Sequence, residues 1–385
     1  MSRVGVIGIG HGTFGRRSDA TVQELAFEAF RLALDDAKIP RKDIEATVIG
    51  AVPEYHKQRS VAGVIQEYLN LNPKPTWLTE VACASGSAAI RTAWMSIQAG
   101  MHRIVAVLGC QKMTELSTPE ILALMGRVGE VQWESVFGTT FPSYYAMFAQ
   151  AHMHKFGTTH EQLLKIAVKN HHYGAKNPKA LFQKEITLEK ALAGEPVASP
   201  FCVYDCCANA DGAVCIILAE ESTAKAVCKD VVWLDGLGCA STSMSVLKRP
   251  DLVSVPSASL AAQQAYQMAK IGPRDIKVAD VHDCFTIAEL MAYEDLGFCE
   301  KGQGGKYIDE KRPYIGGGGV PVNVDGGLKS KGHPIGATGV SMAYEIVTQL
   351  RGRAGERQVP GADVGLTHNV GGIGQYCFVH VFRRD

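Results

Sequence analysis

The sequence predicts an α/β protein made of two similar halves, with a separate segment inserted into the first half. Apolar runs typical of strands alternate with helical patterns over residues 4–109, and the same alternation returns over residues 231–382. Between residues 113 and 200 the alternation stops, and aromatic, His and Met residues gather instead. Because strands and helices alternate, we expect a mixed or largely parallel sheet with helices packed on it.

The first half begins with a buried apolar strand at residues 4–9. Apolar residues then repeat at helical spacing over 20–37, after Asp19 as a candidate N-cap, and small residues fill a second helical stretch at 85–98. The remaining strands of this half are expected at 47–52, 76–81, 103–109 and 212–219.

The segment 113–200 is expected to contain short helices near 144–155 and 161–171, and no strand. Its Met and aromatic residues either line a roomy pocket or pack in a core: Trp133, Phe137, Phe141, Tyr144, Tyr145, Met147 and Phe148. We interpret the segment as a lid or substrate-binding insertion.

The second half repeats the style of the first. Its strands are expected at 231–236, 278–282, 364–367 and 376–382, and its helices at 258–269, 287–296 and 336–350. We therefore divide the chain into an N-terminal half (1–112 and 201–229), an inserted loop or lid region (113–200) and a C-terminal half (230–385).

Composition restricts the function classes. With 46% hydrophobic and 20% charged residues, the 385-residue chain is typical of globular proteins. Lys plus Arg equals Asp plus Glu, at 39 each, so no basic excess indicates a nucleic-acid partner. The longest apolar runs are too short for a membrane span. The odd count of eleven cysteines and an N-terminus without a cleavable apolar segment favour reduced thiols in the cytoplasm.

The run EVACASGSAA, residues 80–89, contains the strongest candidate nucleophile. Cys83 is expected in the turn between a strand and a helix whose first residues are small. Backbone N–H groups and the helix dipole at such a position favour a thiolate, and small neighbours leave room for a carbonyl group. A buried cysteine beside a tightly packed helix is the alternative interpretation.

A second feature is the glycine-rich loop KGHPIGATG, residues 331–339. In this loop His333 is followed by Pro334 and by a helix that begins near Gly336. An imidazole held in this way has a fixed ring, as a general base or an oxyanion donor requires. A purely structural histidine is the alternative.

Two further strand ends carry polar groups. His282 and Cys284 place an imidazole and a thiol at the end of a strand, and Cys284 follows its strand much as Cys83 does. We therefore expect the two cysteines at equivalent positions of the two halves, where open α/β sheets bind ligands. The run HNVGGIG, residues 368–374, is a glycine-rich turn whose N–H groups could complete an oxyanion hole.

Two other motifs point to different functions. The run GHGTFG, residues 10–15, fits the G-x-G-x-x-G pattern of NAD-dependent dehydrogenases, but three polar residues separate it from the next helical pattern. Cys202, Cys206 and Cys207 form half of a zinc motif without a second ligand pair, so no metal is expected.

Taken together, these motifs resemble the thiolase family over nearly the whole chain. Thiolases carry a nucleophilic cysteine in C-x-S-G, matched at 83–86, a G-H-P motif, matched at 332–334, and a glycine turn, matched at 369–374. The resemblance implies the thiolase fold, in which two similar α/β halves form a five-layered α-β-α-β-α arrangement with an inserted loop region.

The sequence departs from the common thiolase pattern at two places. His282-Asp283-Cys284-Phe285 stands where most thiolases have N-E-A-F, and Asn369-Val370-Gly371 stands where most have a C-x-G motif. The H-D-C-F version resembles the sterol-carrier-protein type of thiolase and its bacterial and archaeal relatives. There the cysteine of H-D-C-F is thought to replace the missing one, which implies the acid/base role for Cys284.

The resemblance implies an acyltransferase that uses coenzyme A as co-substrate and binds no permanent cofactor. Cys83 would attack the keto carbon of a 3-oxoacyl-CoA, activated by His333, and Cys284 would protonate the departing enolate. The enolate oxygen would be held by His333 and by a water bound to His282. The acyl-enzyme oxygen would rest on the N–H groups of Cys83 and Gly371.

Substrate contacts are less determined by the sequence. Asn369, Phe285 and Lys331 are the candidate substrate-binding residues. Lys329 and Lys331 either meet a CoA phosphate or an acidic acyl group, or lie on the surface. The substrate is either acetoacetyl-CoA or a branched or aromatic 3-oxoacyl-CoA such as benzoylsuccinyl-CoA.

The resemblance also implies partners and rivals. We expect a homodimer or higher oligomer, and the H-D-C-F relatives often pair with a small protein that combines a zinc ribbon and an OB-fold. A non-catalytic scaffold subunit would normally have lost the cysteine or the G-H-P histidine, and a retro-aldolase would not need both cysteines. These remain the alternative functions.

Overall fold

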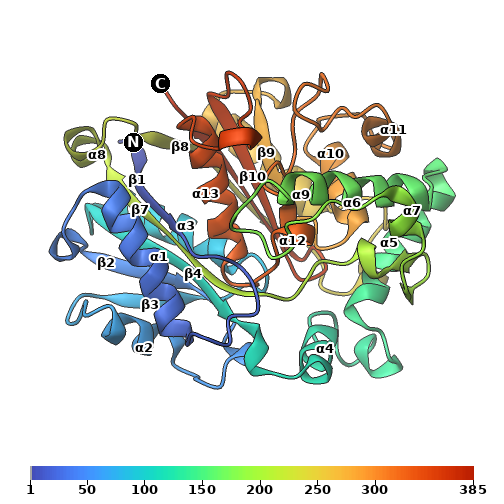
Figure 1. The fold of residues 1–385 in the computed structure, drawn as a ribbon, viewed down its shortest axis with the longest axis horizontal. Coiled ribbons are helices and arrows are strands. Elements are labelled where there is room, and N and C mark those ends of the chain that lie inside the picture. The colour runs from blue at the N-terminus through green and yellow to red at the C-terminus, as the bar shows by residue number, and fades with distance from the viewer. Residues whose placement is uncertain (1) are drawn as a thin grey trace.

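The computed structural model describes residues 2–385. Its central feature is one mixed sheet, which has nine strands within these residues in the order β3-β2-β4-β7-β1-β8-β11-β10-β9 (Figure 1). The strands are β1 (Val4–His11), β2 (Ala46–Gly50), β3 (Thr76–Thr79), β4 (Ile104–Lys112), β7 (Asp211–Glu220), β8 (Val232–Ser241), β9 (Val278–Val281), β10 (Val364–Gly371) and β11 (Tyr376–Arg383).

The two halves repeat one strand arrangement, as the sequence predicts. In the first half β2 is parallel to β4, β4 is antiparallel to β7, and β7 is antiparallel to β1. In the second half β9, β10, β11 and β8 repeat this pattern. Even β3 has a counterpart, because Val322 forms a parallel bridge with Ala279 of β9. The halves are joined by the antiparallel pairing of β1 with β8.

Helices from both halves complete the expected five layers. The outer helices are α1 (Val22–Ala37), which packs on β1, β4 and β7, and α9 (Pro256–Ala269), which packs on β8 and β11. Between the halves lie α3 (Ser85–Gln98) and α13 (Thr338–Leu350), which pack against each other. Because α13 contacts strands of both halves, the hydrogen-bonded sheet folds around this helix pair (Figure 1).

The start of α1 differs from the prediction. Its N-cap is Thr21, whose hydroxyl accepts from the Glu24 N–H while the Glu24 carboxylate accepts from the Thr21 N–H. Asp19, the expected cap, instead forms an ion pair of 2.9 Å with Arg17.

The glycine motif at 10–15 leads from β1 into a loop and does not open a helix. The structural context that dinucleotide binding requires is therefore missing.

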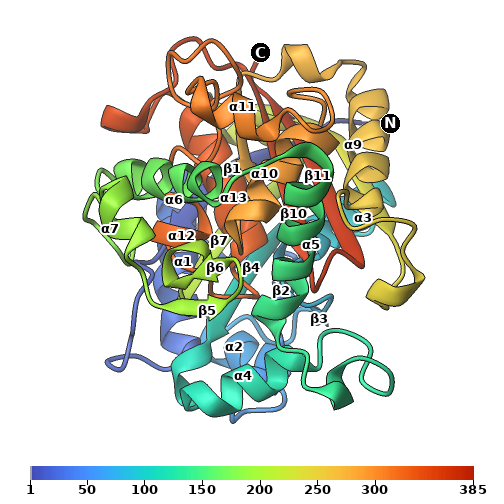
Figure 2. The ribbon, with the colours of Figure 1, turned by 90° about the vertical axis from the view of Figure 1, so that its right-hand side faces the viewer.

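The insertion between β4 and β7 carries α4 (Thr118–Gly126), α5 (Phe141–Phe156), α6 (His160–Gly174) and α7 (Leu188–Leu192). These helices lie on the right-hand side of the molecule in Figure 1, the side that faces the viewer in Figure 2. The expectation of no strand is wrong, because β5 (Pro196–Ala198) pairs with β6 (Phe201–Cys202). A strand of three residues is too short to show an alternating pattern. Phe141, Tyr144, Tyr145 and Phe148 of the insertion are buried, whereas Trp133, Phe137 and Met147 are exposed.

The remaining helices are short or cover the second half: α2 (Val61–Tyr68), α8 (Glu221–Val227), α10 (Thr286–Asp295), α11 (Gly304–Asp309) and α12 (Gly327–Ser330). None of the described helices has the length and apolar composition that crossing a membrane requires.

The topology corrects the expected equivalence of the two cysteines. Cys83 lies between β3 and α3, whereas Cys284 follows β9, which is the counterpart of β2. The second-half counterpart of the Cys83 position is the loop before α13, and that loop contains His333. The repeated fold therefore places a thiol at the start of one central helix and an imidazole at the start of the other.

The first turns of α3 and α13 lie in direct backbone contact. A Cβ atom at Gly339 would lie 2.3 Å from the backbone nitrogen of Ser87, and one at Gly86 would lie 2.9 Å from the carbonyl oxygen of Gly336. Real Cβ atoms essentially never approach another heavy atom within 3.0 Å. Glycine is therefore required here for closeness of approach, not for backbone conformation.

The substitution Gly339→Ala is expected to lower the free energy of unfolding by about 1–3 kcal/mol, because the new methyl group must push two backbones apart. Gly63→Ala in α2 is the matched control, since its Cβ would meet only the Ser60 side chain at 3.9 Å. That change should leave stability equal or higher by about 0.4–1 kcal/mol. Urea unfolding followed by circular dichroism measures both, and equal midpoints for the two variants would contradict the packing argument.

Candidate active site

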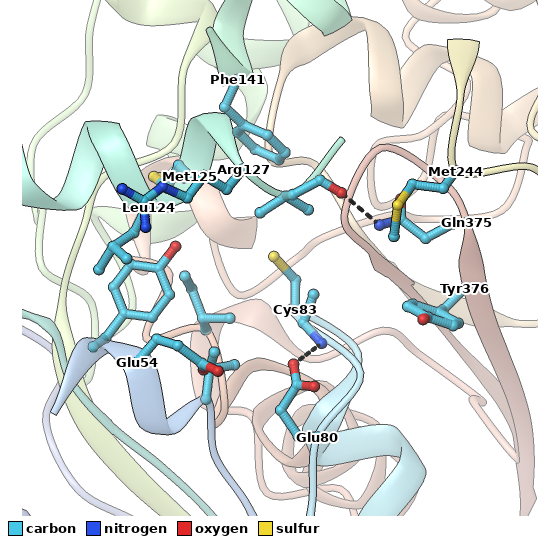
Figure 3. Close-up of a pocket in the computed structure, with 15 residues that line it drawn as sticks. Glu54, Glu80, Cys83, Leu124, Met125, Arg127, Phe141, Met244, Gln375 and Tyr376 are labelled. Atoms are coloured by element: carbon cyan, nitrogen blue, oxygen red, sulfur yellow. Dashed lines mark hydrogen bonds between the residues drawn. The ribbon is translucent and has the colours of Figure 1, made fainter. Parts of the chain in front are cut away.

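Cys83 lies in the turn that leads from β3 into α3, and its side chain is buried. The Ser85 hydroxyl closes the turn by donating to the Ala82 carbonyl at 2.6 Å and accepting from the Val81 N–H at 3.0 Å. Ala82 has a left-handed φ of 52°, and its N–H donates to the Glu80 carboxylate at 2.7 Å. This turn points the Cys83 sulfur into a pocket (Figure 3).

The side chains of His333 and His282 meet Cys83. The Cys83 sulfur and one nitrogen from each ring all lie within 4.8 Å of one another. The two imidazole centroids are 5.1 Å apart, with the rings nearly perpendicular at 75°. The turn before α3, the loop before α13 and the end of β9 thus bring together three residues that the sequence predicts to form one site.

The hydrogen bonds of Thr338 determine which ring nitrogen of His333 carries the proton. The Thr338 hydroxyl donates to the Pro334 carbonyl at 3.1 Å, so it accepts from His333 Nδ1 at 2.7 Å. Neutral His333 therefore carries its proton on Nδ1 and presents a lone pair at Nε2. That nitrogen is buried and has no hydrogen-bond partner among residues 2–385. An unprotonated nitrogen aimed at a thiol is what a general base needs.

Asn369 assigns the opposite tautomer to His282. The Asn369 amide nitrogen lies 3.1 Å from the Cys83 carbonyl oxygen and 3.1 Å from His282 Nδ1. Because a carbonyl only accepts, the nitrogen of the amide faces it, and His282 Nδ1 accepts the second amide hydrogen. Neutral His282 therefore presents an N–H at Nε2, which has no acceptor within the described chain. A fixed N–H donor of this kind suits an oxyanion hole.

Burial keeps these three groups neutral. It raises the pKa of the Cys83 thiol to about 12, with the neighbouring Cys207 acting in the same direction. Burial and the positive charge of Lys331 lower the pKa of His333 to about 3. Burial also lowers the pKa of His282 well below its usual value, and His333 adds to the effect. The expected thiolate at the helix start is therefore wrong for the resting site, which pairs a thiol with a neutral imidazole.

Cys284 is fully buried after β9, and burial raises the pKa of its thiol. Cys83, Cys207 and Cys284 form a group of three thiols in which negative charge on one raises the pKa of another. The Cys207 N–H also donates to the Cys284 carbonyl at 2.9 Å. Because like charges disfavour one another at short range, only one of these sulfurs readily carries a negative charge at a time.

Several site residues were missed by the sequence analysis. The backbone N–H of Gly372, one residue beyond the predicted Gly371, lies near Cys83 and lowers the pKa of its thiol. The hydroxyl of Tyr145 lies near Cys284 and lowers the pKa of its thiol. Thr338 follows the G-H-P motif by one helical turn, so its contact with His333 had a local signal. Tyr145 had no local signal in the sequence, because it lies in the insertion, far along the chain from Cys284.

The candidate substrate-binding residues lie outside the pocket beside Cys83. Asn369 holds His282, as described above. Phe285 is buried in an aromatic stack, with ring centroids 4.7 Å from Tyr145 and 5.5 Å from Phe201. Lys331 is buried against the carboxylates of Asp325 and Asp280.

The surface interpretation of Lys329 and Lys331 is wrong, since each is only 2% exposed. The Lys329 ammonium donates to the Asp205 carbonyl, and the Lys331 ammonium pairs with carboxylates. Both side chains follow the glycine-rich segment before His333 into the interior, where such partners offset the cost of burying their charge.

A cavity of about 350 Å³ opens beside Cys83 (Figure 3). The insertion supplies one wall, and Gln375 ties that wall to the terminal glycine turn by donating to the Val128 carbonyl at 2.9 Å. Most of the lining is apolar. It consists of Val52, Glu54, Tyr55, Glu80, Ala82, Cys83, Leu124, Met125, Arg127, Val128, Phe141, Met244, Ile335, Gln375 and Tyr376.

His160 and Asp205 converge on Cys202, the first cysteine of the incomplete zinc motif. The His160 ring lies 2.8 Å from one Asp205 oxygen, which also accepts from the Cys202 N–H at 2.9 Å. The other Asp205 oxygen accepts from the Thr286 hydroxyl at 2.5 Å. These hydrogen bonds satisfy the carboxylate through protein groups.

The duplicated fold, with a thiol at one central helix start and an imidazole at the other, defines an acyltransferase of the thiolase type, and the chain belongs to the thiolase family. Its residues 4–195 match the thiolase N-terminal domain, and residues 238–384 match the thiolase C-terminal domain-like family.

Curated relatives cover the whole chain. It is 39% identical to the acetyl-CoA acetyltransferase of Methanothermobacter thermautotrophicus, over 100% of both chains. It is 37% identical to the acetyl-CoA acetyltransferase of Methanocaldococcus jannaschii, over 99% of both. It is 34% identical to sterol carrier protein 2 of Oryctolagus cuniculus, over 100% of this chain and 72% of that one. These matches confirm the resemblance to the sterol-carrier-protein branch.

Solved structures share the fold at low sequence identity. The structure described as the Ltp2-ChsH2(DUF35) aldolase has a TM-score of 0.86 at 23% identity, and it covers 100% of this chain and 98% of that one. Human mitochondrial 3-ketoacyl-CoA thiolase has a TM-score of 0.74 at 17% identity, over 100% and 99%. The likeness to the thiolase structure confirms the predicted thiolase fold.

The pKa directions predict how Cys83 reacts with iodoacetamide. Since the thiol pKa is raised to about 12 and the His333 pKa is lowered to about 3, the thiolate fraction should grow about tenfold per pH unit between pH 6 and 9. Mass spectrometry of the Cys83 peptide measures the alkylation rate, and His333→Asn should keep the same slope. A plateau between pH 6 and 8 would instead indicate a preformed thiolate–imidazolium pair.

Proposed function

We propose that this acyltransferase cleaves a 3-oxoacyl-CoA with coenzyme A, or forms it by the reverse Claisen-type condensation, through an acyl-Cys83 intermediate. One observation carries the proposal. The Cys83 sulfur and one ring nitrogen each of His333 and His282 lie within 4.8 Å of one another, and Cys83 lines the cavity. A nucleophile, a base and an oxyanion donor are the three groups that acyl transfer to a thiol requires.

In the first step His333 Nε2 takes the Cys83 proton as the sulfur attacks the keto carbon. A neutral thiol paired with a neutral imidazole suits this step, because charge separation occurs only when the carbonyl is in place. The carbon–carbon bond then breaks and leaves an acyl group on Cys83 and an enolate of an acetyl-CoA-like fragment. The enolate oxygen is held by His333, now protonated, and by the His282 N–H, directly or through a water.

Cys284 completes the exchange as the proton carrier. Its S–H bond breaks as a new C–H bond forms on the enolate carbon, and the sulfur keeps the electron pair. The Cys284 thiolate then takes the proton of an incoming CoA thiol, and the CoA sulfur attacks the acyl-Cys83 carbonyl. The bond between the acyl carbon and the Cys83 sulfur breaks, acyl-CoA leaves, and the Cys83 thiolate takes its proton back from His333. The acyl oxygen rests on the N–H of Cys83 and on the N–H groups of Gly371 and Gly372.

For the substrate we propose acetoacetyl-CoA, supported by the acetyl-CoA acetyltransferases that are 37% and 39% identical. A branched or aromatic 3-oxoacyl-CoA such as benzoylsuccinyl-CoA is the second candidate, favoured by the apolar wall of Leu124, Met125 and Phe141. CoA-dependent cleavage measured over short, branched and aromatic 3-oxoacyl-CoAs separates the two by their kcat/KM. Cleavage that proceeds without CoA would instead support a retro-aldolase.

We also propose that the enzyme works as a dimer or higher oligomer with a small zinc-ribbon and OB-fold partner. The aldolase structure described with two components, Ltp2 and ChsH2, supports a partner subunit. A reducing cytoplasm is the proposed compartment, because all eleven cysteines in the described chain are unpaired.

Replacing the nucleophile, Cys83→Ala, should lower kcat for thiolysis by at least about a thousandfold, because no acyl-enzyme can form. The dissociation constant for a CoA thioester, measured by calorimetry, should change by less than about threefold, since the sulfur contributes little to ground-state binding. Cys110→Ala removes a buried thiol of β4 that packs in a different core cluster, and it should keep activity. Full activity of Cys83→Ala would refute the assignment.

The variant Cys284→Ala should separate the two half-reactions. Radiolabelled acetyl-CoA should still acylate Cys83, because acylation by a thioester needs no proton on carbon. Carbon–carbon bond exchange should fall by about a hundredfold or more, as expected when a general acid is removed. If exchange continues near the wild-type rate, the proton comes from another group.

A further inference from the structure

We propose that Tyr145 is a further catalytic residue of this site, whose hydroxyl pairs with the Cys284 sulfur in both the thiol and the thiolate state. The inference rests on the proposed function, in which Cys284 donates and regains a proton. It adds a residue from the insertion to catalytic groups that otherwise come from the two halves.

The position of Tyr145 is fixed by packing. It lies in α5 with 2% of its surface exposed, and its ring stacks on Phe285 with centroids 4.7 Å apart and an interplanar angle of 26°. Phe285 is the residue directly after Cys284, so the stack holds Tyr145 against the chain segment that carries the thiol. Edge contacts with Phe141 and Phe148, at centroid distances of 5.5 and 5.4 Å, leave the ring little freedom to move.

The Tyr145 hydroxyl lies between Gly372, which is close to the nucleophile Cys83, and Cys284, the proposed proton carrier. It donates to the Gly372 carbonyl at 3.0 Å, and it lies close enough to the Cys284 sulfur to lower the pKa of that thiol. The N–H of the same Gly372 lowers the pKa of the Cys83 thiol. One glycine therefore connects the hydroxyl beside Cys284 to the nucleophile.

The donor and acceptor roles of the hydroxyl follow from its single hydrogen. While Cys284 is a thiol, its S–H donates to the Tyr145 oxygen, whose O–H donates to Gly372. When Cys284 gives its proton to the enolate carbon, the sulfur keeps the electron pair, and the Tyr145 O–H turns from Gly372 to the new thiolate. When CoA–SH returns a proton to Cys284, the O–H turns back to the carbonyl.

Tyr145 is suited to be a donor that stays protonated. Burial raises the pKa of Tyr145 well above its usual value, with Cys284 acting in the same direction. The other titratable groups that act on Cys284 are Cys83 and Asp283, which disfavour its thiolate, and Lys329, which favours it. The Tyr145 hydroxyl is thus the neutral donor that directly supports the Cys284 thiolate.

The test is Tyr145→Phe, which removes the hydroxyl and keeps the ring stacked on Phe285. Carbon–carbon bond exchange should fall about tenfold to a hundredfold, the usual effect of losing a hydrogen bond to a charged group. Acylation of Cys83 by acetyl-CoA, followed by mass spectrometry, should stay within about twofold. Tyr144→Phe is the matched control, because its hydroxyl faces Glu134 and not the thiols, and it should leave both rates unchanged. A parallel loss of acylation and exchange, or unchanged exchange, would overturn the proposal.

A second measurement does not depend on the overall reaction. In a Cys83→Ala background at pH 9, iodoacetamide should alkylate Cys284 about threefold to tenfold more slowly when Tyr145 is also Phe. The reason is that loss of the donor raises the pKa of the Cys284 thiol and reduces its thiolate fraction. Equal alkylation rates would overturn the role of Tyr145. A wild-type enzyme that forms no acyl-Cys83 would contradict the proposed function, while the alkylation rates would still decide on Tyr145.

Discussion

The backbone contact between the first turns of α3 and α13 is the constraint on which the site depends. Cys83 and His333 belong to different halves of the chain, and each sits just before one of these helices. Gly86 and Gly339 allow the two helix starts to touch without intervening side chains. Any wider spacing would separate the sulfur from the imidazole by the thickness of a side chain, and proton transfer between them requires hydrogen-bond reach.

This closeness has an electrostatic consequence. A helix start stabilises a thiolate by about 0.3–1 kcal/mol, and by about 2 kcal/mol in favourable buried geometries. A rise of the Cys83 pKa to about 12, roughly three units, corresponds to about 4 kcal/mol against the thiolate. The cost of burying a thiolate therefore outweighs its stabilisation by the helix dipole, so Cys83 and His333 are neutral in the resting site. The tautomers assigned by Thr338 and Asn369 then matter more than charge, because they decide which imidazole accepts a proton and which donates a hydrogen bond.

Much of the fold followed from local sequence patterns. Strand and helix alternation located the elements of both halves, and α3 begins and ends at the predicted residues, 85 and 98. Short motifs whose residues are needed together identified three candidate site residues: Cys83, His282 and His333.

Features that depend on distant contacts were not predictable in this way. The two cysteines follow their strands in similar local sequence, yet strand pairing makes Cys284 follow the counterpart of β2. Lys331 has the composition of a surface residue, and only the buried carboxylates of Asp325 and Asp280 explain its position. Tyr145 carries no motif, because its partners Gly372 and Cys284 are remote in sequence.

The hydrogen bond between Gln375 and the Val128 carbonyl links the cavity wall to the reacting sulfur mechanically. The Gln375 side chain also accepts from the Ile373 N–H at 2.7 Å. It thereby holds the turn that contains Gly372, whose N–H lowers the pKa of the Cys83 thiol. A bulky acyl chain that pushes the insertion outward must either break this tether or pull the turn with it. One side chain therefore couples the position of the cavity wall to the position of the turn beside the nucleophile.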